Sequence, residues 1–444
     1  EEDDPDLTQL THSGQPKSDL KLSADSKYVF FLEGGKLKKL NIKDKKVENL
    51  GFTAEMDVVV DRENRQKFQE TWWMFDEYYY DPDLHGVDWD RIREKYSPLV
   101  DEVETEDEFN QIILEMMGDL GSSHINIYSR GGGIKKELST AWYGFHLDQD
   151  ELDENGLYRI SLVLPNSPAA LADTPLDTGD YLLAINGQEI NRETNIYPLF
   201  SGQIDKKTIF TVAKGPDAEP YDVTVKGTEF GPIYDLFYDF WVEERRRMVD
   251  SLSDGRLAYI HIRRMYPDAL EKFKLEIVNQ TQDKEGVVLD VRYNGGGNIA
   301  VHLLGILIKE PYIYRNFAGY PVTSENKMRS KALEKPSILL INNGSGSNSE
   351  IFAEGYRKLG LGKIVGERTA GGVIGTASYN LIDGTRIRRP SWGCYTTDME
   401  NLELVPRYPD ITVENMLTDI VKGRDPQLER AVRELLNQIG DKTE

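Results

Sequence analysis

The chain has 444 residues and a formal net charge of −23 at pH 7, with a pI near 4.8. This acidity argues against a nucleic-acid backbone or an anionic membrane as the main partner, because both require a basic face. No stretch approaches about 18 consecutive apolar residues, so we expect no insertion into a membrane. Cys394 is the only cysteine, which excludes an intrachain disulfide and a thiolate metal cluster.

Residues 1–61 are expected to combine a flexible start with a short β segment. Residues 1–17 are polar and acidic without periodicity, which is typical of a flexible segment, and they lack the apolar region of a signal peptide. We therefore expect a cytoplasmic protein, with a periplasmic one as the alternative if a leader was removed. Strand-like runs between residues 20 and 42 resemble one blade of a β-propeller. One blade cannot close a ring, so the segment is interpreted as a remnant of a larger array or as an edge sheet.

Residues 62–140 are predicted to form a small helical domain. The first helix has apolar side chains at helical spacing, namely Phe68, Trp72, Phe75 and Tyr79. A second helix is predicted over about 89–102. A capping-box pattern at residues 105–108 opens a third helix, which ends at Gly121. His124 follows that helix directly, preceded by two serines.

Residues 141–230 have the alternation of short strands. The run Ser-Pro-Ala-Ala at residues 167–170, followed by Gly-Asp-Tyr-Leu-Leu-Ala-Ile-Asn-Gly at 179–187, closely resembles a PDZ domain. The resemblance implies that a peptide C-terminus lies there as an added strand. Its carboxylate would be held by backbone amides near three residues, Tyr143, Gly144 and Phe145. The alternative is a structural sheet whose groove is closed.

Strands and helices alternate over residues 231–444, which favours an α/β domain with a largely parallel sheet. The predicted fold class is therefore multidomain α+β. It comprises the N-terminal β segment, the helical domain, the PDZ-like β domain and this α/β domain, which would be the catalytic one.

Three serines, Ser345, Ser347 and Ser349, lie in a small-residue turn between the apolar run 337–341 and a predicted helix. Such a turn can present a hydroxyl beside the amides and the positive dipole end of a helix. A Gly/Ser turn alone is ordinarily a connection without chemistry. Other residues must therefore supply a base and an oxyanion site.

Two further features could supply them. The glycines at 295–297 follow a strand and expose backbone N–H groups, as an oxyanion hole requires, although the loop lacks the phosphate-binding signatures. None of the six histidines has a partner at metal-ligand spacing, so we expect no metal and no cofactor. His124 is the candidate base, because the serine beside it could hold one imidazole nitrogen and leave the other free.

Several segments resemble, in order, the tricorn-type branch of the C-terminal-processing (tail-specific, S41-like) serine peptidases. They are residues 80–90, 118–124, the PDZ-like region, 290–297 and 359–369. The resemblance extends over about residues 20–440. It implies a serine peptidase that hydrolyses peptides or unfolded proteins through an acyl-enzyme. It also implies a homo-oligomer, with a hexamer as the candidate assembly.

The resemblance assigns the nucleophile and the base. The family nucleophile lies three residues before the acidic residue that opens the helix, and counting back from Glu350 gives Ser347. His124 matches the general base. Ser123 matches the serine that links the histidine to a carboxylate.

The oxyanion hole and the carboxylate are assigned in the same way. The amide of Asn348 and that of Gly295 or Gly296 would form the oxyanion hole. The family glutamate lies seven residues before the Asp of a Pro-Asp-Ile run, which selects Glu403. Glu400 is the alternative, because a Glu-Asn pair is common in the family. Either choice completes a Ser-His-Ser-Glu constellation.

One residue separates two branches of this superfamily. The other branch uses a lysine base within Gly-x-x-Thr-x-Gly-Lys, and Gly372 stands where that lysine would be. The histidine branch is thus the consistent interpretation. The alternative function is a catalytically inactive, PDZ-containing scaffold that binds peptides. The acidic surface weakly favours basic peptides as ligands.

Overall fold

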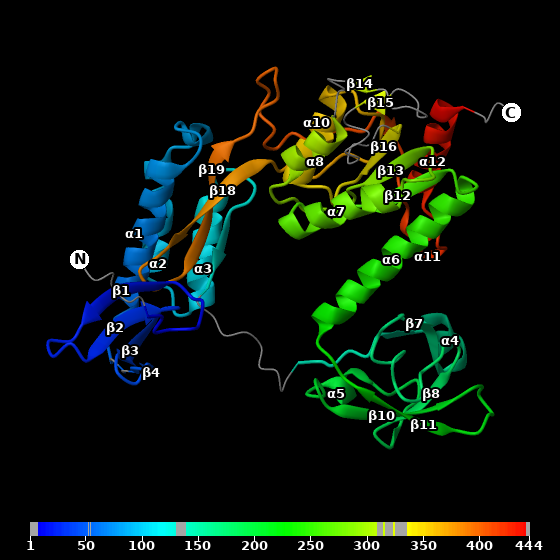
Figure 1. Cartoon of the computed structure of the whole chain (residues 1–444), viewed down its shortest axis with the longest axis horizontal. Helices are drawn as coiled ribbons and strands as arrows, with labels where there is room; N and C mark the ends of the chain where they lie inside the picture. Colours follow the sequence, from blue (N-terminus) through cyan, green and yellow to red (C-terminus); the bar gives the residue numbers. More distant parts are fainter. Residues whose placement is uncertain are drawn as a thin grey trace, which may run out of the picture. The chain divides into compact units, whose positions relative to one another are not determined.

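A computed structural model gives the structure of residues 8–308 and 335–440, except residues 52, 54 and 130–138, with the backbone of 314–315 and 323–324 (Figure 1). The chain divides into two compact units, Glu1–Glu63 and Asn64–Glu444, which are described separately. Of the start that we predicted to be flexible, residues 1–7 lie outside the described residues. No helix in the described part of the chain is long and apolar enough to cross a bilayer.

The first unit is a four-stranded antiparallel meander in the order β1-β2-β3-β4. Its strands are β1 (Lys17–Leu22), β2 (Tyr28–Glu33), β3 (Lys36–Asn41) and β4 (Lys46–Asn49). Gly34 and Gly35 both have positive φ and connect β2 to β3, as a two-residue hairpin requires. Phe31 and Leu40 are buried between the strands. The predicted N-terminal β segment is confirmed.

The helical region contains α1 (Val60–Tyr78), the 3-10 helix η1 (Leu84–Gly86), α2 (Trp89–Val100) and α3 (Glu106–Gly118). The predicted capping box opens α3, because the Thr105 amide donates to Glu108 and the Glu108 amide donates to the Thr105 hydroxyl. The helices share one apolar core, which includes Phe68, Phe75, Trp89, Phe109 and Ile113.

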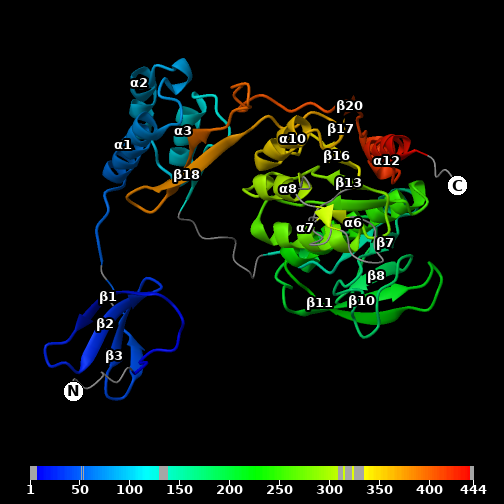
Figure 2. The same ribbon diagram turned by 45° about the horizontal axis from the view of Figure 1, so that its top comes forward.

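A three-stranded sheet also packs on this helical core. It consists of β5 (Asn126–Tyr128), β18 (Ile374–Asn380) and β19 (Arg386–Gly393), in the order β18-β19-β5. Ile127, Leu381 and Ile387 point into the helical core. In Figures 1 and 2 the orange strands β18 and β19 lie beside α3. We had placed the whole of residues 231–444 in the α/β domain, so this contribution to the helical region was not anticipated.

The PDZ-like region is a six-stranded antiparallel sheet with two helices. Its elements are β6 (Phe145–Leu147), α4 (Gln149–Asn155), β7 (Tyr158–Val163), β8 (Tyr181–Ile185), β9 (Gln188–Glu189), α5 (Tyr197–Phe200), β10 (Lys207–Ala213) and β11 (Tyr221–Lys226). The main order is β11-β10-β8-β7-β6, which leaves β6 at an edge of the described sheet.

The α/β region contains a five-stranded parallel sheet in the order β12-β13-β16-β17-β20. Its strands are β12 (Leu257–His261), β13 (Gly286–Asp290), β16 (Ser337–Ile341), β17 (Ile364–Gly366) and β20 (Ile411–Thr412). One face packs on α7 (Pro267–Asn279), α8 (Ala300–Leu307) and α10 (Asn348–Lys358), and the other on α6 (Phe230–Leu252) and α12 (Pro426–Ile439). The remaining elements are β14 (Tyr314–Arg315), β15 (Thr323–Ser324) and α11 (Leu417–Val421).

The two-sided burial explains why these strands are continuous apolar runs. In parallel sheets the carboxyl ends of the strands lie at one edge, where ligands bind. The glycine loop follows β13 and the serine turn follows β16, so this edge brings the two predicted features together. The predicted multidomain α+β fold with a parallel sheet is confirmed.

Candidate active site

Three serines lie in the turn between β16 and α10, and they differ in what their hydroxyls contact. The Ser345 hydroxyl donates to the carbonyl of Val291, and the Ser349 hydroxyl donates to that of Asn294, both at 2.8 Å. The Ser347 hydroxyl donates to no acceptor within the described residues. Ser347 also has φ 55° and ψ −120°, a strained conformation that non-glycine residues rarely adopt outside functional turns. Ser347 is thus the serine whose hydroxyl is available.

Glu350 holds this turn in place. Its carboxylate is fully buried and accepts hydrogen bonds from the amides of Ser347 at 2.9 Å, Gly371 at 2.8 Å and Gly372 at 3.0 Å. The Thr369 hydroxyl donates to it as well. These four donors compensate the cost of burying a charge. Glu350 therefore fixes the serine turn to the loop 369–372, a role that its position in the sequence did not reveal.

His124 and Ser123 lie against a second buried carboxylate. Ser123 Oγ is 2.7 Å from His124 Nδ1 and donates to Glu403 Oε2 at 3.0 Å. Glu403 is only 5% exposed and also accepts from the amides of Ser123 at 2.6 Å and Val373 at 2.9 Å, and from the Ser122 hydroxyl at 3.2 Å. Histidine, serine and glutamate therefore form one hydrogen-bonded series.

The directions of these hydrogen bonds determine the tautomer of the imidazole. All partners of Glu403 are donors, which is the pattern that an ionised carboxylate satisfies. Because Ser123 Oγ donates to Glu403, it accepts from the Nδ1–H of His124. Nε2 is then the unprotonated nitrogen, as a general base requires.

The surroundings of His124 also favour the neutral imidazole. Burial lowers the pKa of His124, and the positive charge of Arg388 lowers this pKa further, whereas Glu403 opposes both effects. The net direction is downward from the ordinary histidine pKa of about 6.5. The imidazole is consequently uncharged at neutral pH.

The two candidate glutamates have different surroundings. Glu403 contacts Ser123, as described above. The Glu400 side chain is 54% exposed and forms an ion pair with Arg407 at 3.3 Å. Of the two, only Glu403 lies where it can hold Ser123.

Gly372 is the common neighbour of the serine turn and the histidine. Its carbonyl accepts from the Ser347 amide at 3.0 Å. A Cβ atom at this position would lie 3.1 Å from Ser123 Oγ and 3.6 Å from His124 Cε1. A side chain here, lysine included, would therefore press on Ser123. Within the described residues, Ser347 Oγ and the imidazole form no hydrogen bond with each other, and such contacts often tighten only when substrate binds.

The predicted oxyanion amides differ in their partners. The Gly296 amide donates to Asn294 Oδ1 at 2.9 Å, whereas the amides of Gly295 and Asn348 have no acceptor among the residues described. Gly296 has φ 99°, and a Cβ on it would lie 2.6 Å from Ser347 Cβ and 2.8 Å from the Asn348 nitrogen. Only glycine allows the loop to approach Ser347 this closely. Gly295 and Asn348 supply the two unoccupied N–H groups.

A second layer of hydrogen bonds, which our sequence analysis missed, lies behind Glu403. His85 Nδ1 is 2.9 Å from the carbonyl of Leu120, so Nδ1 carries the proton, and Nε2 lies 2.6 Å from Tyr80 Oη. Asn401 Nδ2 donates to Tyr80 Oη at 3.4 Å, and Asn401 Oδ1 accepts from the Glu403 amide at 3.0 Å. The only signal in the sequence was the resemblance of residues 80–90 to the family.

The PDZ-like region contains a groove beside the edge strand β6. A cavity of about 410 Å³ lies between β6 and α5. Its lining includes the apolar side chains of Trp142, Phe145, Leu147, Ile196, Tyr197 and Phe200. The amides of Tyr143 and Gly144 have no described acceptor, and the Tyr143 side chain is buried with its hydroxyl 2.6 Å from that of Thr208. The described region thus has a cavity beside β6, and peptide binding there stays a prediction.

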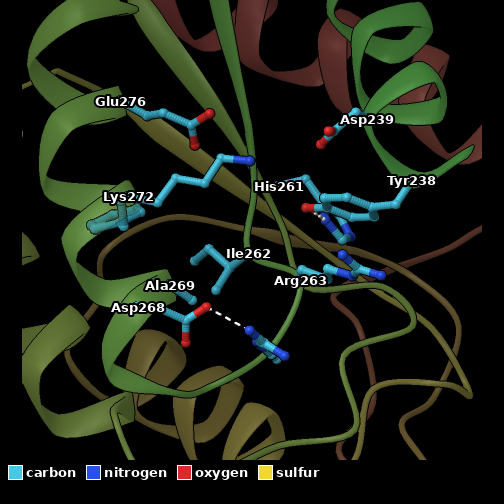
Figure 3. A pocket seen from close by; sticks show the side chains of 11 residues that line it. Tyr238, Asp239, His261, Ile262, Arg263, Asp268, Ala269, Lys272 and Glu276 are labelled. Carbon is cyan, nitrogen blue, oxygen red and sulfur yellow. Dashed lines mark hydrogen bonds and ion pairs between the residues drawn. The ribbon is translucent and has the colours of Figure 1, made fainter. Parts of the chain in front are cut away.

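Another hollow, of about 170 Å³, lies at the end of β12 between α6 and α7 (Figure 3). Charged side chains line it, including Asp239, Lys272 and Glu276. It contains none of the predicted site residues. Ile262 belongs to the lining of this hollow, and its carbonyl accepts from Asn294 Nδ2 at 2.7 Å. The segment after β12 thereby supports the glycine loop.

Two protein-family models match parts of this chain. Residues 256–413 match the model of peptidase family S41, and residues 60–118 match that of the tricorn protease C1 domain. Tricorn protease homolog 1 of Streptomyces coelicolor is 30% identical over 96% of this chain and 41% of its own length. The tricorn protease of Thermoplasma acidophilum is 28% identical over 95% of this chain and 40% of its own length.

A solved structure has the same fold. The crystal structure of the tricorn protease superposes on this chain with a TM-score of 0.80 and 26% identity. The superposition covers 95% of this chain and 41% of the tricorn chain. The chain thus spans less than half the length of these two tricorn relatives. Together these matches support a tricorn-type protease of peptidase family S41.

Proposed function

We propose that this chain is a serine peptidase that hydrolyses peptide bonds through an acyl-enzyme formed on Ser347. The observation that carries the proposal is the hydrogen-bonded series Glu403–Ser123–His124, which leaves Nε2 of His124 free. Gly372 adjoins both halves of the site, because its carbonyl accepts from the Ser347 amide and a Cβ atom on it would lie 3.6 Å from the His124 ring. Peptides and unfolded proteins are the proposed substrates.

The first half of the reaction forms the acyl-enzyme. Ser347 Oγ attacks the scissile carbonyl carbon while His124 Nε2 takes its proton. The imidazolium donates through Nδ1 to Ser123, whose hydroxyl donates to Glu403, so the negative carboxylate stabilises the new positive charge. Nε2 then gives its proton to the leaving amine and the C–N bond breaks. In the second half, water repeats these steps and releases the acid.

The amides of Gly295 and Asn348 are the proposed oxyanion hole. Both are unoccupied among the described residues, and Asn348 begins α10, where the positive end of the helix dipole lies. One such donor contributes about 10²–10³ in kcat. The Gly296 amide already donates to Asn294 Oδ1, so Gly296 is assigned a structural role in the loop and not a place in the oxyanion hole.

The PDZ-like groove is proposed to hold the C-terminus of a peptide as a strand added to β6. The edge position of β6, the apolar lining and the free amides of Tyr143 and Gly144 support this role. A homo-oligomer remains a prediction, which sedimentation of the purified chain would test.

Hydrolysis of a fluorogenic peptide tests the proposal against the inactive scaffold. We expect wild-type protein to show turnover with a burst of the first product, and Ser347→Ala to lose several orders of magnitude in kcat while it still binds peptide. Full turnover in Ser347→Ala would exclude the mechanism. Peptide binding without turnover in wild type would support the scaffold instead.

A further inference from the structure

The sheet β18–β19–β5 has a second face that the mechanism above does not use. Ile127 and Ile387 are paired neighbours that point into the helical core, so the alternate positions point the other way. On that opposite face the strands carry Asn126, Tyr128, Arg386, Arg388, Thr376, Ser378 and Asn380. We call this set the arginine face.

The charge of the arginine face is opposite to that of the chain. The sequence contains 76 acidic residues, yet none of these described positions is acidic. Among the described residues, the contacts of Arg386 and Arg388 are with uncharged groups and include no ion pair. Arg388 Nε donates to Thr376 Oγ1 at 3.1 Å, and the Arg386 guanidinium lies over the Tyr128 ring at 4.4 Å. These contacts orient the two guanidinium groups, and no carboxylate of the described residues pairs with either of them.

The arginine face begins at the candidate base. Arg388 pairs with Asn126, which lies two residues after His124. The charge of Arg388 reaches the imidazole, since it is one of the causes that lower the pKa of His124. A peptide whose scissile bond lies at His124 therefore has Arg388 close to its flanking residues.

We propose that the arginine face binds carboxylate groups of the substrate, and that Arg388 and Arg386 make the enzyme select acidic peptide segments beside the scissile bond. This rests on the proposed function, because it concerns the substrate of the same site. Guanidinium groups bind carboxylates in a bidentate way, which suits both arginines.

The spacing of the two arginines fits an extended peptide. Residues two apart on a strand lie about 7 Å apart and point to the same side. An extended substrate has the same repeat, so acidic side chains at alternate positions can meet both guanidinium groups. The preference opposes the weak attraction of basic peptides expected from the net charge. Contacts of a few ångströms outweigh a distributed charge that salt screens beyond about 8 Å.

The carboxylate could belong to an Asp or Glu side chain or to the substrate C-terminus. Matched peptides separate the two sources. They share one scissile sequence, carry two alternate Glu, Gln or Lys residues on either side of it, and end in a free or an amidated C-terminus. We expect kcat/KM to be about tenfold or more higher for a carboxylate-bearing peptide than for its Gln counterpart, and lowest for the Lys peptide.

Variants identify the residues. In Arg386→Glu/Arg388→Glu the order of the Glu and Lys peptides should invert, whereas in Arg247→Gln, an exposed control on α6, it should not change. A dependence on the free C-terminus alone would support the inference with the α-carboxylate as ligand. Equal kcat/KM for Glu, Gln and Lys peptides in wild type would overturn it, as would an equal loss for all three in the double variant.

Binding to Ser347→Ala protein separates this inference from the proposed function, because it requires no turnover. Fluorescence anisotropy of the labelled peptides should give the same order of Kd values, with a preference that weakens as salt is raised. The same affinity for acidic and basic peptides would refute the arginine face even if the wild type is an active peptidase. A clear acidic preference would sustain it even if no hydrolysis occurs.

Discussion

Two buried carboxylates hold the two halves of the site, and they do so from different kinds of structure. Glu350 lies on α10 and fixes the serine turn to the loop after β17, all within the α/β region. Glu403 lies outside helices and strands and fixes Ser123 and the base, which follow a helix 280 positions earlier in the sequence. The proposed nucleophile is therefore held by local structure, and the proposed base by a contact between distant segments. Changes in the two halves should have separable effects.

The largest expected effect is at the nucleophile. Ser347→Ala should lower kcat by several orders of magnitude with little change in unfolding free energy, because its hydroxyl donates to no described group. Ser349→Ala is the matched control. It removes a buried hydrogen bond to the Asn294 carbonyl, so it should lower stability by about 1–3 kcal/mol and retain the chemistry. Steady-state kinetics measures kcat and denaturant unfolding measures the unfolding free energy of each variant. A large loss of kcat in Ser349→Ala with activity retained in Ser347→Ala would count against Ser347.

Glu403→Gln should be next. All partners of Glu403 are donors, so the NH₂ group of a glutamine would face two other donors, and the Ser123 hydroxyl would be held less well. We expect kcat to fall by about 10²–10⁴, as when the orienting residue of a triad is lost. Glu400→Gln, at an exposed ion pair, should change kcat less than about twofold. Comparable losses in the two variants would remove the distinction between these glutamates.

The pH dependence tests the base. The pKa of His124 is lowered, and the residue acts as a base only when neutral, so the acid limb of kcat/KM should lie below about pH 6.5. Arg388 is one cause of the lowering. Arg388→Gln should therefore raise the pKa of His124 and shift the acid limb to higher pH. A shift to lower pH, or an acid limb well above 6.5 in wild type, would contradict this account.

The smallest expected effect comes from Tyr80, whose hydroxyl contacts the asparagine that holds the Glu403 amide. Tyr80→Phe removes the hydroxyl that joins His85 to Asn401, so Glu403 should be held less firmly. We expect kcat to fall by a factor of about 3–10 with KM unchanged, since the loss of one positioning hydrogen bond is worth about 1 kcal/mol. Tyr96→Phe, in the same helical core, should leave kcat as it is. An increase in KM alone would argue for a role in substrate binding.

The sequence carried local information better than pairings between distant segments. The strand–turn–helix around Ser347 and the helix that ends before His124 were predictable, because both depend on neighbouring residues. The family resemblance selected Glu403 and left Glu400 as the alternative, because the sequence alone does not show which carboxylate becomes buried against Ser123. The choice of Gly295 over Gly296 depends on a single side chain, Asn294, that occupies one amide.

The arginine face was hidden for the same reason. Arg386 and Arg388 alternate in the sequence as on any strand, but the pairing of β19 with β5 is what sets Arg388 opposite Asn126, two residues after His124, and Arg386 opposite Tyr128. Register between strands so far apart is set by tertiary packing, here by Ile127 and Ile387 in the helical core. A single sequence does not reveal such a pairing.

The most direct test of the account is the site of reaction with a fluorophosphonate, which modifies an activated serine. Mass spectrometry of the labelled wild-type protein should find one adduct, on Ser347, and His124→Ala should lose it because no base remains to activate the hydroxyl. An adduct on Ser345 or Ser349, or no adduct in folded wild-type protein, would contradict the central claim that Ser347 is the nucleophile.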